Sequence, residues 1–198
     1  MNSPVPAGKV AAVVLAGGAS KRMGAANKLL AEVNGVTLVY RAVQTAMQSG
    51  ASEVIVVTGH EADLVREALS DLDVRFVDNP HYTEGLSTSL KAGVGAVSEN
   101  FVGAVVLLGD MPRVTTKTVN ALIDQFHSNT DKPICQPTFD GWPGNPILWP
   151  RRFFSDILDI QGDIGAKRLI ERFSEQVSKV DVDDAGIHFD IDTPDDLK

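Results

Sequence analysis

The sequence predicts an α/β protein with a mostly parallel sheet and helices on both of its faces. The first observation is an alternation of strand-like and helix-like segments, repeated four times between residues 9 and 126. The second is an unbroken β-branched and apolar run at the start of that alternation, typical of a strand buried on both faces. The third is the length, because 198 residues bury a sufficient core without a disulfide or a metal. We therefore expect one three-layer α/β/α domain over residues 1–198.

Four strand–helix pairs are expected to follow one another along the chain. They are strand 9–16 with helix 37–49, strand 53–59 with helix 61–72, strand 74–79 with helix 85–97, and strand 101–110 with helix 115–126. Gly50 ends the first helix. Ser87 is expected to open the third helix and Thr115 or Thr116 to cap the fourth, because hydroxyl side chains accept the unpaired N–H groups of a first helical turn.

The alternation breaks between residues 133 and 150. This stretch holds five of the ten prolines and two glycines, which predicts short strands and turns in a small antiparallel excursion. Cys135 is expected to be a small buried hydrophobe. Trp142 and Trp149 are expected to be buried in the excursion, the alternative being that they stack on a planar ligand. A helix at 162–173, a strand at 175–182 and an acidic segment complete the chain.

The composition excludes several classes of protein. A single cysteine rules out an intrachain disulfide framework, and none of the four histidines forms a pair at metal-ligand spacing. A formal net charge of -8 without a basic stripe argues against nucleic acid as a partner. No apolar run approaches the roughly 18 residues of a membrane span, and the first ten residues do not resemble a signal peptide. We expect a cytoplasmic protein with no membrane partner.

The segment LAGGASKRMGAANKLL, residues 15–30, joins two glycines to a cluster of basic residues. It follows the first strand, and ligands of open parallel sheets bind beyond the carboxyl ends of the strands. Gly17 and Gly18 allow a phosphate to approach backbone N–H groups, while Lys21, Arg22 and Lys28 supply positive charge. The spelling matches neither the Walker A loop nor the dinucleotide fingerprint. The segment predicts a small anionic ligand, and the alternative is a solvated basic turn.

Acidic residues occur at two places that could complete such a site. Asp110 directly follows a buried strand, at the same sheet edge as the glycines, although an Asp there can also form a turn. In HFDIDTPDDL, residues 188–197, Asp190 and Asp192 share a face if the chain is extended. The two acids after them suit the first turn of a helix. We predict that Asp110 and Asp192 bind Mg²⁺, with Asp190 as the alternative second ligand.

Several motifs in order resemble one branch of a known enzyme family. The loop at residues 15–30 and GDMP resemble the phosphate loop and metal-binding segment of nucleotidyltransferases. NPHYTEGLSTSLKAGV, GWPGNPILW, LDIQGDIGAKRLIE and DIDTPDDL together resemble the molybdenum-cofactor cytidylyltransferases. The resemblance runs from Val13 to Leu197. It implies a Rossmann-like nucleotidyltransferase fold and the transfer of CMP from CTP to the phosphate of molybdopterin, with Mg²⁺ as cofactor. A client molybdoenzyme or its chaperone is an implied further partner.

The resemblance also implies roles for individual residues. Those that hold the nucleotide are Leu15, Ala16, Gly17, Gly18, Lys28, Asn79, Gly85, Leu86, Ser87 and Asp110. The implied catalytic residues are Arg22, Lys28 and Asp110, the metal ligands are Asp110 and Asp192, and the residues facing the acceptor are Asn145, Gly162, Asp163 and Gly165. Simpler roles remain possible, with Asn79 as a turn residue and Ser87 or Asp163 as helix caps.

The choice of substrates stays open at this point. The loop begins LAGG, as in the guanylyl branch, whereas EGLSTSL and GDIGAK resemble the cytidylyl branch, so CTP is favoured over GTP. Another phosphate could be the acceptor, because the glycine loop does not read it. A different class of protein, an oxidoreductase or a chaperone that binds a dinucleotide or cofactor, is the remaining alternative.

Overall fold

The computed structural model describes residues 8–18, 27–160, 166–191 and 196. One sheet has the strand order β10-β7-β9-β6-β1-β4-β5, with β8 paired to β7 outside this path. Its strands are β1 (Lys9–Ala16), β4 (Glu53–Thr58), β5 (Arg75–Asp78), β6 (Phe101–Leu108), β7 (Ile134–Phe139), β8 (Trp142–Pro143), β9 (Ile147–Pro150) and β10 (Val177–Asp181). A separate hairpin pairs β2 (Glu32–Val33) with β3 (Val36–Thr37).

The pairing is mostly parallel. Strand β1 lies between β4 and β6 and is parallel to both, β4 is parallel to β5, and β7 is parallel to β10. The antiparallel strands of this large sheet are β9, which pairs with β6 and β7, and β8, which pairs with β7. Both belong to the stretch at residues 133–150 where the strand–helix alternation breaks. The predicted parallel sheet with a small antiparallel excursion is therefore confirmed.

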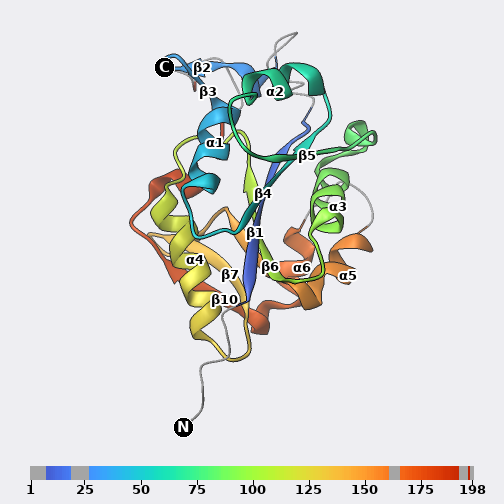
Figure 1. Cartoon of the computed structure of the whole chain (residues 1–198). Helices are drawn as coiled ribbons and strands as arrows, with labels where there is room; N and C mark the ends of the chain where they lie inside the picture. The colour runs from blue at the N-terminus through green and yellow to red at the C-terminus, as the bar shows by residue number, and fades with distance from the viewer. Residues whose placement is uncertain (1–7, 19–26, 161–165, 192–195, 197–198) are drawn as a thin grey trace.

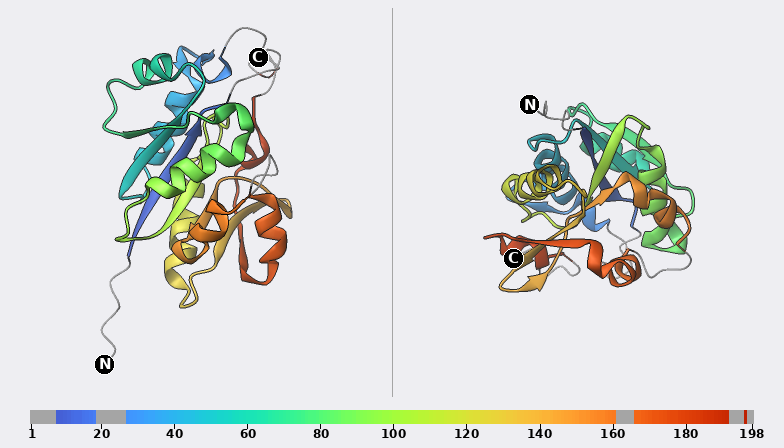
Figure 2. Two further views of the ribbon diagram at one scale, coloured as in Figure 1. Left: turned by 90° about the vertical axis from the view of Figure 1, so that its right-hand side faces the viewer. Right: turned by 90° about the horizontal axis from the view of Figure 1, so that it is seen from below.

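Helices cover both faces of the sheet (Figure 1). The helices are α1 (Leu38–Met47), α2 (Ala62–Ala68), α3 (Leu86–Ala96), α4 (Thr116–Ser128), α5 (Phe154–Leu158) and α6 (Lys167–Arg172). Buried residues of α1, α2 and α4 belong to one hydrophobic cluster, and those of α3, α5 and α6 belong to a second on the opposite face. Figure 2 shows the same three layers from two further directions. The α/β/α prediction is confirmed.

Strand β1 explains why the layers form. Its side chains alternate between the two clusters, with Val10, Ala12 and Val14 in one and Ala11 and Val13 in the other. A strand whose side chains pack into a hydrophobic core on both faces needs apolar residues on both faces. The sequence of β1 therefore does not alternate between apolar and polar residues. The continuous apolar run thus fixes β1 as an interior strand.

Some local predictions need correction. The positive φ of Gly85 (114°), which glycine adopts without steric cost, makes Gly85 the residue that precedes α3, so Ser87 lies inside the helix and does not open it. Trp149 is buried at 1% exposure, but Trp142 is 73% exposed because β8 is a two-residue strand paired to the last two residues of β7. Thr115 caps α4 as expected.

The C-terminal part of the chain also differs in detail from the expectation. The helix expected at 162–173 is described as α6, which covers residues 167–172, and residues 161–165 lie outside the described part. A short helix, α5, precedes it and was not anticipated. Short 3₁₀ turns occur at Lys28–Leu30, Tyr82–Glu84, Arg151–Phe153, Ser174–Gln176 and Ala185–His188. No helix in the described ranges has the length and apolar character needed to cross a bilayer.

Candidate active site

The carboxyl ends of β1 and β6 lie side by side at one edge of the sheet. Leu15 is in register with Leu108, and the N–H of Gly109 donates to the carbonyl of Leu15 at 3.0 Å. The segments that follow the two strands therefore leave the sheet together. They line an open pocket of about 470 Å³, where parallel-sheet proteins bind their ligands.

An ion pair lies in this pocket. Lys28 Nζ is 2.6 Å from Asp110 Oδ2, and both side chains are largely shielded from solvent, at 13% and 19% exposure. Lys28 opens a 3₁₀ turn that is held by Asn27, whose Oδ1 accepts the N–H of Leu29 at 3.1 Å. Leu29 is buried in the hydrophobic core and so anchors this turn. Lys28, after the glycines, and Asp110, after β6, thus lie in contact at this edge of the sheet.

The two glycines of the loop line the same pocket for different reasons. A Cβ on Gly17 would lie 2.9 Å from Ser89 Oγ, closer than such atoms normally approach, so α3 leaves no room for a side chain there. A Cβ on Gly18 would meet none of the described atoms within 4 Å. Gly17 therefore serves close packing, whereas no described contact excludes a side chain at Gly18.

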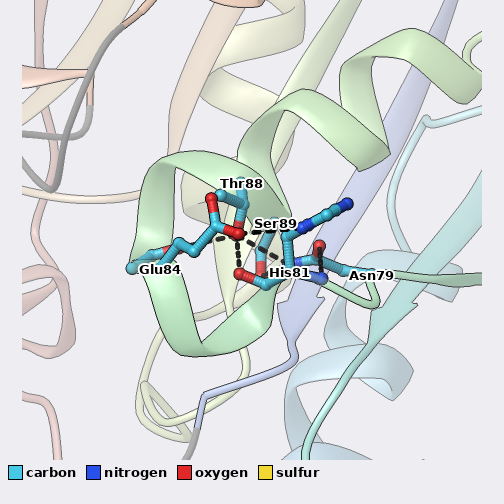
Figure 3. Close-up of polar contacts among 6 residues, drawn as sticks. Asn79, His81, Glu84, Thr88 and Ser89 are labelled. Atoms are coloured by element: carbon cyan, nitrogen blue, oxygen red, sulfur yellow. Dashed lines mark hydrogen bonds and ion pairs between the residues drawn. The ribbon is translucent and has the colours of Figure 1, made fainter.

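Asn79 organises the opposite wall of the pocket (Figure 3). Its Nδ2 donates to Thr88 Oγ1 at 2.8 Å and to Ser89 Oγ at 3.0 Å, and its Oδ1 accepts the N–H of His81 at 3.0 Å. The side chain is only 3% exposed. Asn79 thus ties the end of β5 to α3 and fixes the 3₁₀ turn Tyr82–Glu84, whose residues line the pocket.

A second pocket of about 560 Å³ adjoins the first and shares Leu15, Leu86 and Leu108 with it. Its wall is mostly apolar and comes from α3, β6, β9 and α6. Asn145 and Gln136 are among its polar lining residues. The backbone N–H of Asn145 donates to the carbonyl of Ile187 at 3.1 Å. The two adjoining pockets offer space for two substrates that meet above the ends of β1 and β6.

The family of the chain follows from a sequence profile. The profile of the MobA-like NTP transferase domain matches residues 12–179, which include the glycine loop, Lys28, Asp110 and Asn145. The chain belongs to this family. It is accordingly a nucleotidyltransferase of the MobA-like type, with the Rossmann-like fold of that family.

Two similar curated proteins cover nearly the whole chain. Molybdenum cofactor cytidylyltransferase of Escherichia coli is 30% identical over 186 residues, which are 93% of this chain and 92% of that protein. Nicotine blue oxidoreductase of Paenarthrobacter nicotinovorans is 28% identical over 190 residues, which are 93% of this chain and 92% of that protein. These two proteins carry different names for their reactions, so likeness to them does not by itself fix the substrates.

Two solved structures share the fold along almost the entire length. A nucleotidyl transferase from Methanothermobacter thermautotroptrophicus has a TM-score of 0.82 and 28% identity, and the match covers 95% of this chain and 94% of that one. A Mycobacterium tuberculosis protein in complex with manganese has a TM-score of 0.78 and 27% identity, with 95% of each chain covered.

Several predicted site residues of this MobA-like chain lie at the pockets. Leu15, Gly17, Gly18, Lys28, Gly85, Leu86 and Asp110 line the first pocket, and Asn145 lines the second. Ala16 is the buried last residue of β1, and Asn79 and Ser87 are buried behind the first pocket. The predicted residues Arg22, Gly162, Asp163, Gly165 and Asp192 lie outside the described part of the chain.

Asp192, the predicted second metal ligand, lies outside the described residues, whereas Asp190 and Ile191 before it are described. Asp190 lines the first pocket, and the N–H of Ile191 donates to the carbonyl of Asp110 at 3.0 Å. Ile191, and Asp190 directly before it, are therefore held beside Asp110. Within the described residues, no group of three or more His, Cys, Asp or Glu side chains is arranged to hold a metal ion.

Tyr82, Thr83, Glu84 and Ser89 line the first pocket without having been predicted. They lie next to predicted residues in NPHYTEGLSTSL, the first three between the asparagine and α3 and Ser89 within α3. Gly85 is the signal in the sequence for the three residues before α3. A glycine can adopt the positive φ found directly before this helix, and such a backbone bend places the preceding turn beside the helix start. Ser89 could not be recognised from pattern alone, since its role depends on how closely α3 packs against Gly17.

Proposed function

We propose that the protein transfers CMP from CTP to the phosphate of a molybdopterin-type acceptor and releases pyrophosphate. The observation that carries this proposal is the 2.6 Å contact between Lys28 and Asp110 in a pocket that Gly17 and Gly18 also line. The likeness to a molybdenum cofactor cytidylyltransferase over 93% of the chain supports this nucleotide and this acceptor. Residues 1–198 would then form one nucleotidyltransferase domain whose product passes to a molybdoenzyme or its chaperone.

The proposed reaction is an in-line displacement at the α-phosphorus of the nucleotide. An oxygen of the acceptor phosphate forms the new P–O bond while the bond from the α-phosphorus to the bridging oxygen breaks, so pyrophosphate leaves with the bonding electron pair. A phosphate is largely ionised near neutral pH, so the chain needs no general base. Lys28 would hold the leaving pyrophosphate, and Arg22 of the same loop would provide a second cation.

The acidic side chains fit a hard divalent cation. Asp110 and Asp190 both line the first pocket, and Mg²⁺ binds one or two carboxylates together with substrate phosphate oxygens. We propose that Asp110 and either Asp190 or Asp192 hold Mg²⁺. When bound, the ion would neutralise charge on the phosphates. The manganese complex of the M. tuberculosis structural relative supports a divalent ion in this family.

The test is a turnover assay with separated substrates. Purified protein receives CTP, GTP, ATP or UTP with Mg²⁺ and molybdopterin, and pyrophosphate release is followed together with the mass of the product. We expect release with CTP and molybdopterin together, and a dinucleotide product. A preference for GTP would identify the guanylyl alternative, which the LAGG spelling favours. Release with a different phosphate acceptor but none with molybdopterin would overturn the proposed acceptor.

One observation favours a second candidate. The similar Paenarthrobacter nicotinovorans protein is named an oxidoreductase, and the second pocket here is largely apolar, as a planar aromatic substrate requires. An oxidoreductase would consume a reduced nicotinamide cofactor and release no pyrophosphate. Incubation of the protein with NADH or NADPH and a dye acceptor separates the two candidates, because the nucleotidyltransferase should oxidise neither cofactor.

A further inference from the structure

We infer that Asp184 is a positioning residue for the candidate active site, because its carboxylate holds residues 184–191 against the loops that carry Asp110 and Asn145. The inference rests on the proposed function, in which Asp110 holds Mg²⁺, and on the acceptor-binding role that the family resemblance implies for Asn145. Asp184 lies beyond residues 12–179, the span of the family profile. It also lies outside the motifs that the sequence patterns single out.

The carboxylate of Asp184 is buried, at 7% exposure of the residue, and its bonds within the described chain use both oxygens. Oδ2 accepts hydrogen bonds from Thr115 N at 2.9 Å, from Thr115 Oγ1 at 2.9 Å and from Thr118 Oγ1 at 2.5 Å. Oδ1 accepts the N–H of Gly186 at 2.9 Å. One side chain thus binds the first turn of α4 on one side and the start of the C-terminal segment on the other.

The charge of Asp184 suits this position. A helix of 13 residues presents unpaired N–H groups and a partial positive charge at its first turn, which stabilises a carboxylate there. An asparagine could not replace it, because the backbone N–H groups of Thr115 and Gly186 each donate to a different oxygen. An amide would turn its own N–H₂ group toward one of these donors and leave that N–H without an acceptor.

Close backbone approaches show how tightly the segment is held. A Cβ on Gly186 would lie 2.3 Å from the carbonyl oxygen of Arg113, in the loop that follows Asp110. A Cβ on Gly144 would lie 2.4 Å from the carbonyl oxygen of Ile187. Side chains at these two glycines would push the segment away from both loops. The geometry therefore places the segment in direct contact with the backbones on either side of it.

The segment then reaches both halves of the site. The carbonyl of Ile187 accepts the N–H of Asn145 at 3.1 Å, and the N–H of Ile191 donates to the carbonyl of Asp110 at 3.0 Å. Both isoleucine side chains are buried, which fixes the chain that carries Asp190 between them. Asp184 contacts neither pocket itself, so it acts through the position of Asp190 relative to Asp110 and through the position of Asn145.

The experiment compares the full-length protein with Asp184→Asn and with a matched control, Asp181→Asn. Asp181 lies on β10, and its described side-chain bond is a 3.5 Å contact with Thr138 Oγ1. Amide hydrogen exchange at Ile191 and Asn145 is measured first, followed by Mn²⁺ binding and the turnover kinetics.

For Asp184→Asn we expect faster exchange at both amides and a dissociation constant for Mn²⁺ raised roughly 10–100-fold, as for outer-shell changes at metal sites. We expect kcat to fall and the KM for CTP to stay within about threefold, with higher Mn²⁺ restoring part of kcat. The control should match the wild type.

A purely structural role predicts a different result. If Asp184→Asn speeds exchange only at amides of the first turn of α4, and Ile191, Asn145 and Mn²⁺ binding stay unchanged, Asp184 is a helix cap and the inference is wrong. If Asp184→Asn does not fold, Thr118→Val removes one of the bonds to Oδ2 and should give the same changes in smaller measure. If the wild type shows no turnover, the proposed function fails, whereas exchange and Mn²⁺ binding still decide the role of Asp184.

Discussion

Lys28 Nζ lies 2.6 Å from Asp110 Oδ2, at the edge of the sheet where β1 and β6 end. This contact joins the two charges that a metal-dependent reaction of phosphates needs: a cation for phosphate oxygens and an acid for a metal ion. Both groups are largely shielded from solvent, so each charge is partly compensated by the other. The pair is therefore the most direct place to test the proposed chemistry.

The first prediction concerns Asp110. Asp110→Asn removes the carboxylate but keeps the shape of the side chain, so the fold should persist while kcat falls roughly 100-fold or more, since a bound metal contributes several kcal/mol to transition-state stabilisation. Pyrophosphate release measures kcat. CTP affinity without metal should not weaken, because Lys28 loses its competing partner. An Asp110→Asn variant with ordinary turnover would refute the role of this carboxylate.

The second prediction concerns Gly17. Gly17→Ala places a methyl group 2.9 Å from Ser89 Oγ, so the glycine loop or α3 must shift and CTP binding should weaken. Removing the obstructing oxygen in Gly17→Ala/Ser89→Ala should restore part of that affinity. Gly18→Ala is the matched control for stability, since its methyl group would meet none of the described atoms within 4 Å. Calorimetric titration with CTP and thermal unfolding measure the two effects, and equal losses of stability in both alanine variants would contradict the steric explanation.

Much of the fold could be predicted from the sequence because its signals are local. The uninterrupted apolar run of β1 is a direct consequence of its two-sided burial. The glycines, Lys28 and Asp110 were also predictable, since parallel strands carry the residues after them to one edge. In each of these cases a short stretch of sequence, an apolar run or the residues directly after it, is sufficient to predict the position of its residues in the fold.

Other features depend on backbone geometry and contacts that the residue types alone do not reveal. Trp142 is exposed because β8 is short and pairs only at the C-terminal end of β7, which no property of the tryptophan reveals. Ser87 was assigned to the start of α3, but the backbone of Gly85 begins that helix earlier. Asp184 belongs to the C-terminal acidic segment, for which the sequence gives no structural prediction, and its carboxylate is buried against α4. For Asp184 the deciding partners, Thr115 and Thr118, lie 69 and 66 residues away in the sequence.

The third prediction concerns Asn79. Asn79→Ala removes the bonds to Thr88, Ser89 and His81 and leaves buried polar groups without partners, which should lower the free energy of unfolding by about 1–3 kcal/mol. The KM for CTP should rise because the turn Tyr82–Glu84 is no longer fixed. Asn129→Ala is the control: it removes a 2.8 Å bond to the Gln125 carbonyl at the end of α4, and the KM should not change. A KM unchanged in both variants would show that Asn79 does not shape the nucleotide pocket.

The fourth prediction concerns pH and Cys135. Burial raises the pKa of the Cys135 thiol from 9.0 to about 12. The unfolded chain therefore loses this proton at lower pH than the folded one, so the stabilisation is complete below about pH 9 and is lost between pH 9 and 12, at up to about 1.4 kcal/mol per pH unit. Cys135→Ala lacks this contribution, and its stability should fall less steeply with alkaline pH. Urea unfolding of both proteins between pH 8 and 10.5 measures the difference, because other titrating groups affect both alike. Parallel curves would contradict it.

The last prediction concerns the divalent ion and the nucleotide together. If carboxylates of the pocket hold Mg²⁺ and the ion in turn binds phosphate oxygens, CTP and Mg²⁺ should stabilise the fold more together than either does alone. At a nucleotide concentration 100 times its dissociation constant, binding contributes about 2.7 kcal/mol. For a chain of this size that corresponds to a rise in Tm of roughly 5–10 °C. EDTA should remove most of this rise, and Asp110→Asn should show little of it even with Mg²⁺.

The variant Lys28→Met distinguishes the role of the lysine from that of the aspartate. Lys28→Met should weaken CTP binding in EDTA as well as in Mg²⁺, whereas Asp110→Asn should weaken it only in Mg²⁺. Identical shifts for the two variants under both conditions would mean that the ion pair acts as a structural unit and not as two separate ligands of a metal–nucleotide complex.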